Sequence, residues 1–177
     1  MVTIVLAAND DFSAFLELAG EVEDLFGPMV DEPGFHDAVR RNISRRSALL
    51  ARDSLGTPAG GLLFSPHHHP TYTVRWFVVA ERYRSKGLGE ALLAKAFCKW
   101  VKPPCTVEVV SFGPDHPGAR ARHFYERLGF RGTGPAAPGP EGGSRQMFRM
   151  SLDRLPGWAE PHGDSGAGRR SIARQDQ

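Results

Sequence analysis

The sequence lacks any apolar run long enough to cross a bilayer, and it contains only two cysteines in 177 residues. A membrane-spanning helix needs about 20 consecutive apolar residues, so no membrane segment is expected. Residues 1–6 carry no basic side chain, and Asp10 and Asp11 follow, which argues against a signal peptide. Cys98 and Cys105 have no histidine or second cysteine at ligand spacing, so we expect free thiols and no metal site. These absences predict a cytoplasmic protein.

The sequence also has no large excess of charge, because its formal net charge at pH 7 is +2. Domains that bind nucleic acid usually carry a stronger positive charge, so nucleic acid is not an expected partner. One predicted helix face keeps that alternative open, and a solvated surface explains the same face; it carries Arg40, Arg41, Arg45 and Arg46.

The length and composition predict a single globular domain with a substantial core. Apolar residues make up 41% and charged residues 24% of the chain, as in ordinary globular proteins. The domain is expected to span residues 1–155. Residues 156–177 are small, polar and without periodicity, which predicts a disordered C-terminal tail.

Hydrophobic periodicity predicts the element order β-α-α-β-β-β-α-β-α-β-β, which is typical of an α/β (α+β) domain with helices covering a central sheet. Strands are expected at residues 2–7, 47–52, 61–65, 71–80 and 106–111, at Phe130, and at 146–152. Helices are expected from residues 9–11 to Gly27, after Pro33-Gly34, at 88–100, and from Pro117 to Gly129. Residues 132–144 are rich in glycine and proline and predict a mobile loop.

A glycine loop joins the longest predicted strand to the third predicted helix, with the sequence Arg84-Ser85-Lys86-Gly87-Leu88-Gly89. Glycine permits positive φ angles and leaves no Cβ to block a ligand that lies on the backbone. The first turn of a helix has unpaired N–H groups and a positive dipole end, which favours a pyrophosphate. Glu90 follows where a Walker loop needs Lys-Ser/Thr, and Leu92 stands where a dinucleotide fingerprint needs glycine. A tight turn that serves packing alone is the structural alternative.

Two segments resemble signatures of the GNAT superfamily of N-acetyltransferases. Residues 76–93, which contain the glycine loop, resemble its motif A, and residues 123–130 (HFYERLGF) resemble the helix end that carries "FYxxLGF". The predicted element order also matches this family from residue 2 to about 152. The resemblance implies a mixed, mostly antiparallel sheet of six to seven strands flanked by about four helices. It further implies acetyl-CoA as co-substrate and transfer of the acetyl group to a primary amine.

The resemblance also implies which residues bind the co-substrate. Backbone groups of Phe77, Val78 and Val79 would pair with the pantetheine arm like an added strand, and the N–H groups from Ser85 to Glu90 would hold the pyrophosphate. The complete implied set is Phe77, Val78, Val79, Arg84, Ser85, Lys86, Gly87, Leu88, Gly89 and Glu90.

Two residues are candidates for proton transfer. The resemblance places Tyr125 at the thioester sulfur, where a phenol could protonate the departing thiolate; an aromatic core position is its structural alternative. Glu108 lies in a Val-Glu-Val strand that resembles the family's "Leu-Glu-Val" and is the candidate base, with a solvated or salt-bridged glutamate as alternative. The sequence departs from the family at Gly118, where many members have a cofactor-contacting asparagine. Asp115 is a candidate replacement.

The acceptor is not fixed by the sequence. Acidic residues cluster between the first two helices and could attract a cationic amine, or simply be solvated; they are Glu21, Glu23, Asp24, Asp31 and Glu32. His67-His68-His69 is expected to be an exposed loop, with a place beside the acceptor as the alternative. A small-molecule amine is favoured because no extra domain is present to hold a protein, while a protein amine and a homodimer are left open. A non-catalytic module that binds acyl-CoA is the second functional hypothesis.

Overall fold

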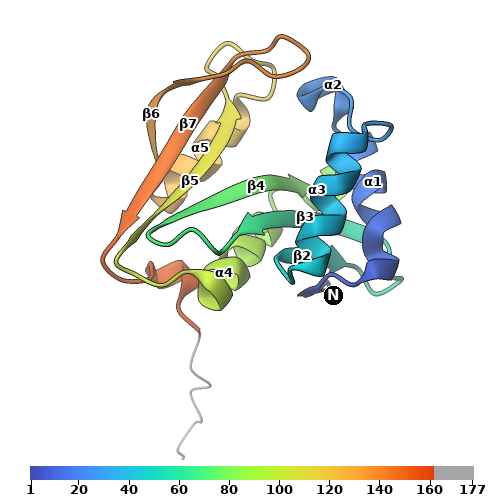
Figure 1. The fold of residues 1–177 in the computed structure, drawn as a ribbon, viewed down its shortest axis with the longest axis horizontal. Coiled ribbons are helices and arrows are strands. Elements are labelled where there is room, and N and C mark those ends of the chain that lie inside the picture. Colours follow the sequence, from blue (N-terminus) through green and yellow to red (C-terminus); the bar gives the residue numbers. More distant parts are fainter. Residues whose placement is uncertain (162–177) are drawn as a thin grey trace, which may run out of the picture.

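The computed structural model describes residues 1–161, and these form a seven-stranded sheet with helices on both faces (Figure 1). The strand order is β1-β2-β3-β4-β5-β7-β6, and only the β4–β5 pair is parallel. The strands are β1 (Thr3–Leu6), β2 (Ala48–Arg52), β3 (Pro58–Ser65), β4 (Thr71–Val79), β5 (Cys105–Phe112), β6 (Arg131–Ala136) and β7 (Arg145–Leu152). The helices are α1 (Phe12–Gly20), α2 (Glu23–Phe26), α3 (Pro33–Ser44), α4 (Leu88–Trp100) and α5 (Arg120–Leu128). The mixed, mostly antiparallel sheet predicted from the sequence is confirmed.

The first predicted helix is interrupted, which is why the described residues hold five α-helices rather than about four. Val22 leaves the helical conformation with φ −128°, and its side chain remains buried. The following Glu23 accepts hydrogen bonds from the backbone N–H groups of Met29 and Val30, at 2.8 and 2.7 Å. The break therefore lets the Glu23 carboxylate bind two backbone N–H groups of the connection between α2 and α3.

Two predicted boundaries near the end of the domain are wrong. Pro117 lies in a turn, and α5 begins only at Arg120, because His116 Nδ1 accepts the Gly118 N–H at 2.9 Å and prolongs that turn. The predicted loop 132–144 contains most of strand β6, which pairs with β7 at the edge of the sheet. An edge strand tolerates Pro135, because an edge strand has backbone groups that need no partner within the sheet.

The first residues of the predicted tail pack on the folded domain. Residues Gly157–Ala159 form a short 3-10 helix. The Trp158 ring lies 4.9 Å from the Phe97 ring, and its Nε1 donates to Leu128 O at 3.0 Å. Packing therefore extends past residue 155. The rest of the predicted tail, residues 162–177, lies outside the described residues.

The sheet separates two apolar cores. One, on the face covered by α4 and α5, includes Leu92, Phe97 and Tyr125; the other, under α1 and α3, includes Phe15 and Trp76. None of the helices in the described part of the chain combines the length and hydrophobicity that a membrane span requires.

Strands β4 and β5 diverge, and this divergence positions the candidate site. Their parallel pairing covers only four residue pairs and ends at Val74 and Val109, although β4 continues to Val79 and β5 to Phe112 (Figure 1). A register shift in the β3–β4 ladder leaves Arg75 without a partner. Such a bulge bends a strand and increases its twist.

Candidate active site

The glycine loop forms a run of free backbone donors at the start of α4. Ser85 and Gly87 both have positive φ angles, +58° and +80°. Within residues 1–161, no backbone N–H from Ser85 to Glu90 donates to the protein, and the first that does is that of Ala91, to Gly87 O at 3.0 Å. Successive N–H groups in such a turn form a concave anion site, and the helix dipole adds a positive field. The loop can therefore hold a pyrophosphate.

The two basic side chains of this loop are partly engaged by backbone carbonyls. Arg84 Nε donates to Val79 O at 3.0 Å, and Lys86 Nζ donates to Arg82 O at 2.8 Å. Both residues are exposed. Their positive charges thus stay beside the loop and face solvent, where an anion can reach them.

Gly89 is required by close packing. A Cβ at this position would lie 3.1 Å from two ring atoms of Phe124 and 3.4 Å from Phe77. Glycine here lets the first turn of α4 approach α5 and β4 together.

The edge of β4 beyond the divergence offers two backbone positions. The Ala80 N–H donates to Ala59 O at 2.9 Å, which places Ala80 on the β3 side of the strand. Because backbone groups alternate between strand edges, those of Val78 also face β3, whereas those of Phe77 and Val79 face the open side. The backbone groups of Val78 therefore face β3, and Phe77 and Val79 are the two predicted positions whose backbone faces the open edge.

Tyr125 lies on the inner face of α5, and only 5% of its surface is exposed. Its ring packs against Phe124, Phe130 and Phe148, with centroid distances of 5.2, 5.6 and 5.8 Å. Burial raises the pKa of the phenol well above its ordinary value near 10. Its hydroxyl makes no hydrogen bond to another residue in the described range. A neutral phenol without a partner is suited to donate a proton.

Glu108 lies on the opposite face of β5 from Tyr125. Val107 and Val109 belong to the core that contains Tyr125, so strand alternation turns Glu108 toward the α1/α3 side. Its Oε1 lies 2.7 Å from Arg149 Nε on β7. The structure therefore does not bring the two candidates into contact, although Glu108 lies one residue before the point where β4 and β5 part.

Gly118 and Asp115 are both occupied by structural contacts. A Cβ at Gly118 would overlap the Phe112 ring, so this position does not accommodate an asparagine with the ring where it is. Asp115 accepts a hydrogen bond from the Ser144 hydroxyl, and this bond lowers the pKa of the carboxyl group. Asp115 is thus directed to the β6–β7 connection.

Part of the predicted acidic cluster is also occupied. Glu23 holds the α2–α3 connection, and Glu21 forms an ion pair with Arg82 at 3.3 Å. The hydrogen bonds from Val30 and Met29 lower the pKa of Glu23 against a smaller opposing effect of burial. Asp24, Asp31 and Glu32 form no ion pair within residues 1–161.

Sequence reasoning missed a buried polar network beside the divergence. Arg145 Nη1 lies 2.6 Å and His116 Nε2 3.2 Å from Glu141 Oε1, and His116 stacks on Phe112 with 4.2 Å between ring centroids. The spacing of Glu141 and Arg145 gave no signal for it, because residues four apart face each other only on a helix, and this segment is a loop that leads into β7. Arg149, the partner of Glu108, gave none, because strand register does not follow from sequence spacing.

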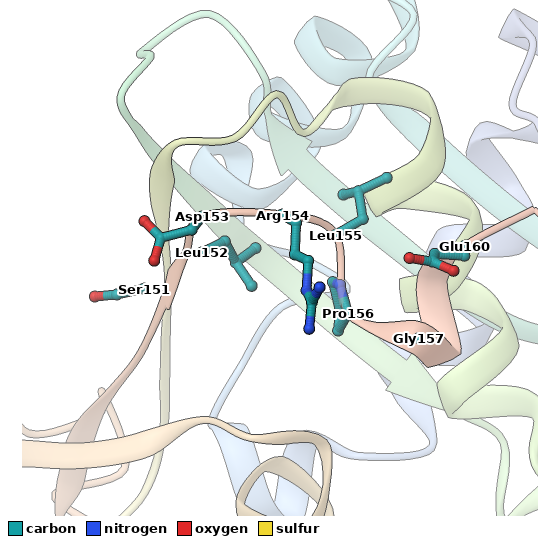
Figure 2. A pocket seen from close by; sticks show the side chains of 8 residues that line it. All are labelled: Ser151, Leu152, Asp153, Arg154, Leu155, Pro156, Gly157 and Glu160. Carbon is teal, nitrogen blue, oxygen red and sulfur yellow. The ribbon is translucent and has the colours of Figure 1, made fainter.

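One cavity of the described residues lies away from this candidate site. It has a volume of about 580 Å³ and is formed by residues 151–160 (Figure 2). The carboxylates of Asp153 and Glu160 lie on opposite sides of Arg154 and do not converge on one point. Residues 1–161 contain no group of three or more His, Cys, Asp or Glu side chains placed to bind a metal, and Cys98 and Cys105 are free.

The splayed strands, the run of free N–H groups from Ser85 to Glu90 and the buried phenol of Tyr125 lie on the elements where the resemblance to the GNAT family implies them. The model of the acetyltransferase (GNAT) family matches residues 14–130, which is more than half of the chain. The chain therefore belongs to the GNAT acetyltransferase family, whose co-substrate is acetyl-CoA. Among curated proteins, none matches this sequence significantly.

Several solved structures share this fold at low sequence identity. The ribosomal-protein-S18-alanine N-acetyltransferase from Escherichia coli is 18% identical with a TM-score of 0.66, covering 89% of this chain and 97% of its own. Ard1 from Thermoplasma volcanium is 17% identical with a TM-score of 0.68, covering 85% and 97%. The NatC complex bound to Gag peptide and CoA contains a chain that is 16% identical with a TM-score of 0.66, covering 85% and 98%.

Proposed function

We propose that the protein transfers the acetyl group of acetyl-CoA to a primary amine of a small molecule by direct attack. The observation that carries this proposal is the run of six consecutive backbone N–H groups, Ser85 to Glu90, that have no acceptor within the described residues. Backbone donors without a partner in the protein are satisfied by water or by a ligand. A diphosphate has the charge and the oxygen atoms to satisfy them.

The backbone of this chain binds and orients the co-substrate. The nest from Ser85 to Glu90 holds the diphosphate. The open edge of β4 at Phe77 and Val79 aligns an extended amide-containing arm as a neighbouring strand would. The Val79 N–H faces the same side, where it can stabilise negative charge on a carbonyl oxygen.

Two side chains handle protons. Acetyl-CoA supplies the activated thioester, and Tyr125 holds a proton at Oη that is available to the departing sulfur. The raised pKa of Tyr125 keeps that proton on the phenol throughout the physiological pH range. Glu108 is the candidate acceptor of the proton from the attacking amine, and Arg149 holds its carboxylate at the strand divergence.

The packing around α2 favours a small acceptor over an extended peptide. Phe26 of α2 contacts Phe112 of β5, with 4.7 Å between ring centroids. The β6–β7 connection reaches the same place, because a Cβ at Gly27 would lie 2.8 Å from Pro140. Through these contacts the α2 region meets both β5 and the β6–β7 connection, near which α2 lies in the ribbon (Figure 1). We expect them to restrict the space for an extended peptide. A protein amine remains the second candidate, since the Escherichia coli structure belongs to an enzyme that acts on a ribosomal protein.

The first prediction tests cofactor binding and turnover separately. Calorimetry should show acetyl-CoA binding to both the wild type and Tyr125→Phe, because the phenol hydroxyl contributes little to ground-state affinity. Release of free thiol with a panel of small amines should fall at least about 100-fold in Tyr125→Phe, the usual loss for a general acid.

CoA binding and thiol release distinguish between the functional hypotheses. Absence of any interaction with CoA or its acyl forms would overturn the whole proposal. Tight CoA binding without thiol release from any small amine or peptide would favour the non-catalytic module. Release with peptides alone would shift the acceptor to a protein amine.

A further inference from the structure

A second cavity gathers basic side chains from separate parts of the chain. It has a volume of about 520 Å³, within the size range of small-molecule sites. Its basic side chains come from the end of α3, the β3–β4 connection, and the end of α4: Arg45, Arg46, His67, His69, Lys99 and Lys102. No carboxylate contributes to the lining.

The charge of this cavity is uncompensated within the described residues. Arg45, Arg46, Lys99 and Lys102 are all exposed, and none forms an ion pair with a carboxylate in residues 1–161. These four positive charges exceed the net charge of the whole chain, which is +2. Basic side chains that line one cavity without a carboxylate produce a positive local potential, which attracts anions.

The helix dipoles explain only part of this arrangement. A basic residue in the last turn of a helix is stabilised by the dipole, which accounts for one side chain on each helix. Arg46, however, follows the end of α3 with a φ of +56°, a conformation that costs a non-glycine residue roughly 1 kcal/mol or more. An arginine holds a position where glycine is usual, and it lines the cavity.

This cavity and the glycine loop lie at opposite ends of α4. Trp100 lies at its wall and at the end of α4, whereas the diphosphate nest lies at the start of α4 near Leu88. The rise of a helix separates these ends by about 18 Å. One diphosphate cannot occupy both places.

We propose that this cavity binds a small, soluble anion that carries two or more phosphate groups. The guanidinium groups of Arg45 and Arg46 hold phosphate oxygens in a bidentate manner, and Lys99 and Lys102 neutralise the remaining charge. Basic residues from three separate segments line this one cavity, an arrangement that suits a small anion. This site is independent of the acetyl-transfer chemistry proposed above.

The test is a calorimetric titration of the full chain with inorganic tripolyphosphate, with and without saturating CoA. The double variant R45Q/K99Q removes two charges from the cavity. The matched control R41Q/K95Q removes the same charges one turn earlier on the same two helices, outside the cavity. All four side chains are exposed, and thermal melts of both variants check the fold.

Tripolyphosphate should bind the CoA-saturated wild type. R45Q/K99Q should weaken that binding at least about tenfold, as expected for loss of charge-assisted hydrogen bonds. R41Q/K95Q should leave it within about twofold, because exposed charges outside the cavity contribute little. No binding in the presence of CoA, or an equal loss in both variants, would overturn the proposal.

A parallel arm separates other sources of phosphate. Vesicles of anionic phospholipid and a DNA duplex are titrated at physiological salt with the same variants. Neither should show binding that depends on Arg45 and Lys99. If either does while tripolyphosphate does not, the surface serves a macromolecule and the proposed ligand class is wrong. The variants remain informative even if CoA fails to bind.

Discussion

The Glu108 carboxylate lies 2.7 Å from Arg149 Nε, and this ion pair governs what Glu108 can do as a base. The Glu108 side chain is 19% exposed and that of Arg149 is 49% exposed. A partly solvated pair is weak, because water screens both charges. The carboxylate can therefore be held in place by the pair and still exchange this contact for a cationic amine.

The second prediction concerns this residue. Glu108→Gln should lower kcat/KM about 100-fold at pH 7, because a neutral amide cannot accept the proton of the amine. The deficit should shrink as the pH approaches the pKa of the acceptor, since the amine then loses its proton without help. Rates measured by thiol release from pH 6 to 10 provide the profile.

Arg149→Gln is the matched control. It releases the carboxylate without removing it, so kcat/KM should change by less than about tenfold. If Glu108→Gln has a wild-type profile, the base is another group, and Glu108 is a structural partner of Arg149.

At the scale of elements, the residue that caps the start of α4 is left-handed. Gly87 has φ +80° and is the N-cap of α4, without a side-chain hydrogen bond to cap the helix. A Cβ at Gly87 would meet no atom within 4 Å, so replacement there changes backbone preference and not packing. A substitution at Gly87 therefore tests the backbone conformation of the loop without disturbing side-chain packing.

The third prediction uses this property. Gly87→Ala should lower the free energy of unfolding by about 1 kcal/mol through its positive φ, and it should weaken CoA binding about tenfold by disturbing N–H groups that bond the diphosphate. Gly56→Ala is an equivalent control in the β2–β3 turn, with φ +83° and no atom within 4 Å of a Cβ. It should lose similar stability and keep its CoA affinity. Equal CoA affinity in both variants would contradict the assignment of the nest.

The β5–α5 and β6–β7 connections are joined by the network around Glu141. Burial acts to raise the pKa of Glu141, but hydrogen bonds from Arg145 and His116 outweigh it and hold the pKa at about 2, against an ordinary 4.5. A depressed pKa in the folded state stabilises the protein above the unfolded value. This contribution is lost as the pH falls from about 4.5 to about 2.

The fourth prediction follows from the lowered pKa of Glu141. The difference in unfolding free energy between wild type and Glu141→Gln should be constant from pH 5 to 7, with the wild type more stable. It should shrink as the pH falls from about 4.5 toward about 2. Urea unfolding at several pH values measures the difference. A difference that does not change with pH would mean that Glu141 is not ionised in the network.

At the scale of the whole molecule, the segment after β7 packs against α4 and the end of α5. Trp158 packs on Phe97 of α4 and donates to Leu128 O at the end of α5. This one side chain joins the cofactor-loop helix to the helix that carries Tyr125. The segment therefore supports both halves of the candidate site.

The fifth prediction is that Trp158→Ala lowers the free energy of unfolding by roughly 2–3 kcal/mol, at the low end for a tryptophan because the ring is only partly buried. Trp158→Phe should cost about 1 kcal/mol, since it keeps the ring contact and loses one hydrogen bond. Chemical denaturation measures both. Equal losses for the two variants would mean that the hydrogen bond, and not the packing, holds the segment.

Much of the architecture could be predicted because the local signals were strong. The bounds of α4 were predicted correctly, since Gly87 precedes it and Pro103-Pro104 follows it. The break at Val22 was missed because the apolar periodicity continues across it. β6 was missed because glycine and proline disfavour strands locally, and pairing with β7 outweighs that preference. Residues 156–160 were taken for part of a tail because a single tryptophan has no periodicity.

The candidate site likewise combines features that the sequence predicted with features that only the folded structure revealed. The sequence alone determined the glycine loop, its place between strand and helix, and the aromatic helix that carries Tyr125, because these depend on neighbours within a few residues. Only the tertiary structure decided that Val78 faces β3, that Glu108 pairs with Arg149, and that basic residues from α3 and α4 meet around one cavity. Those contacts join residues that are far apart in the chain. They depend on strand register and helix packing, and the whole core sets both.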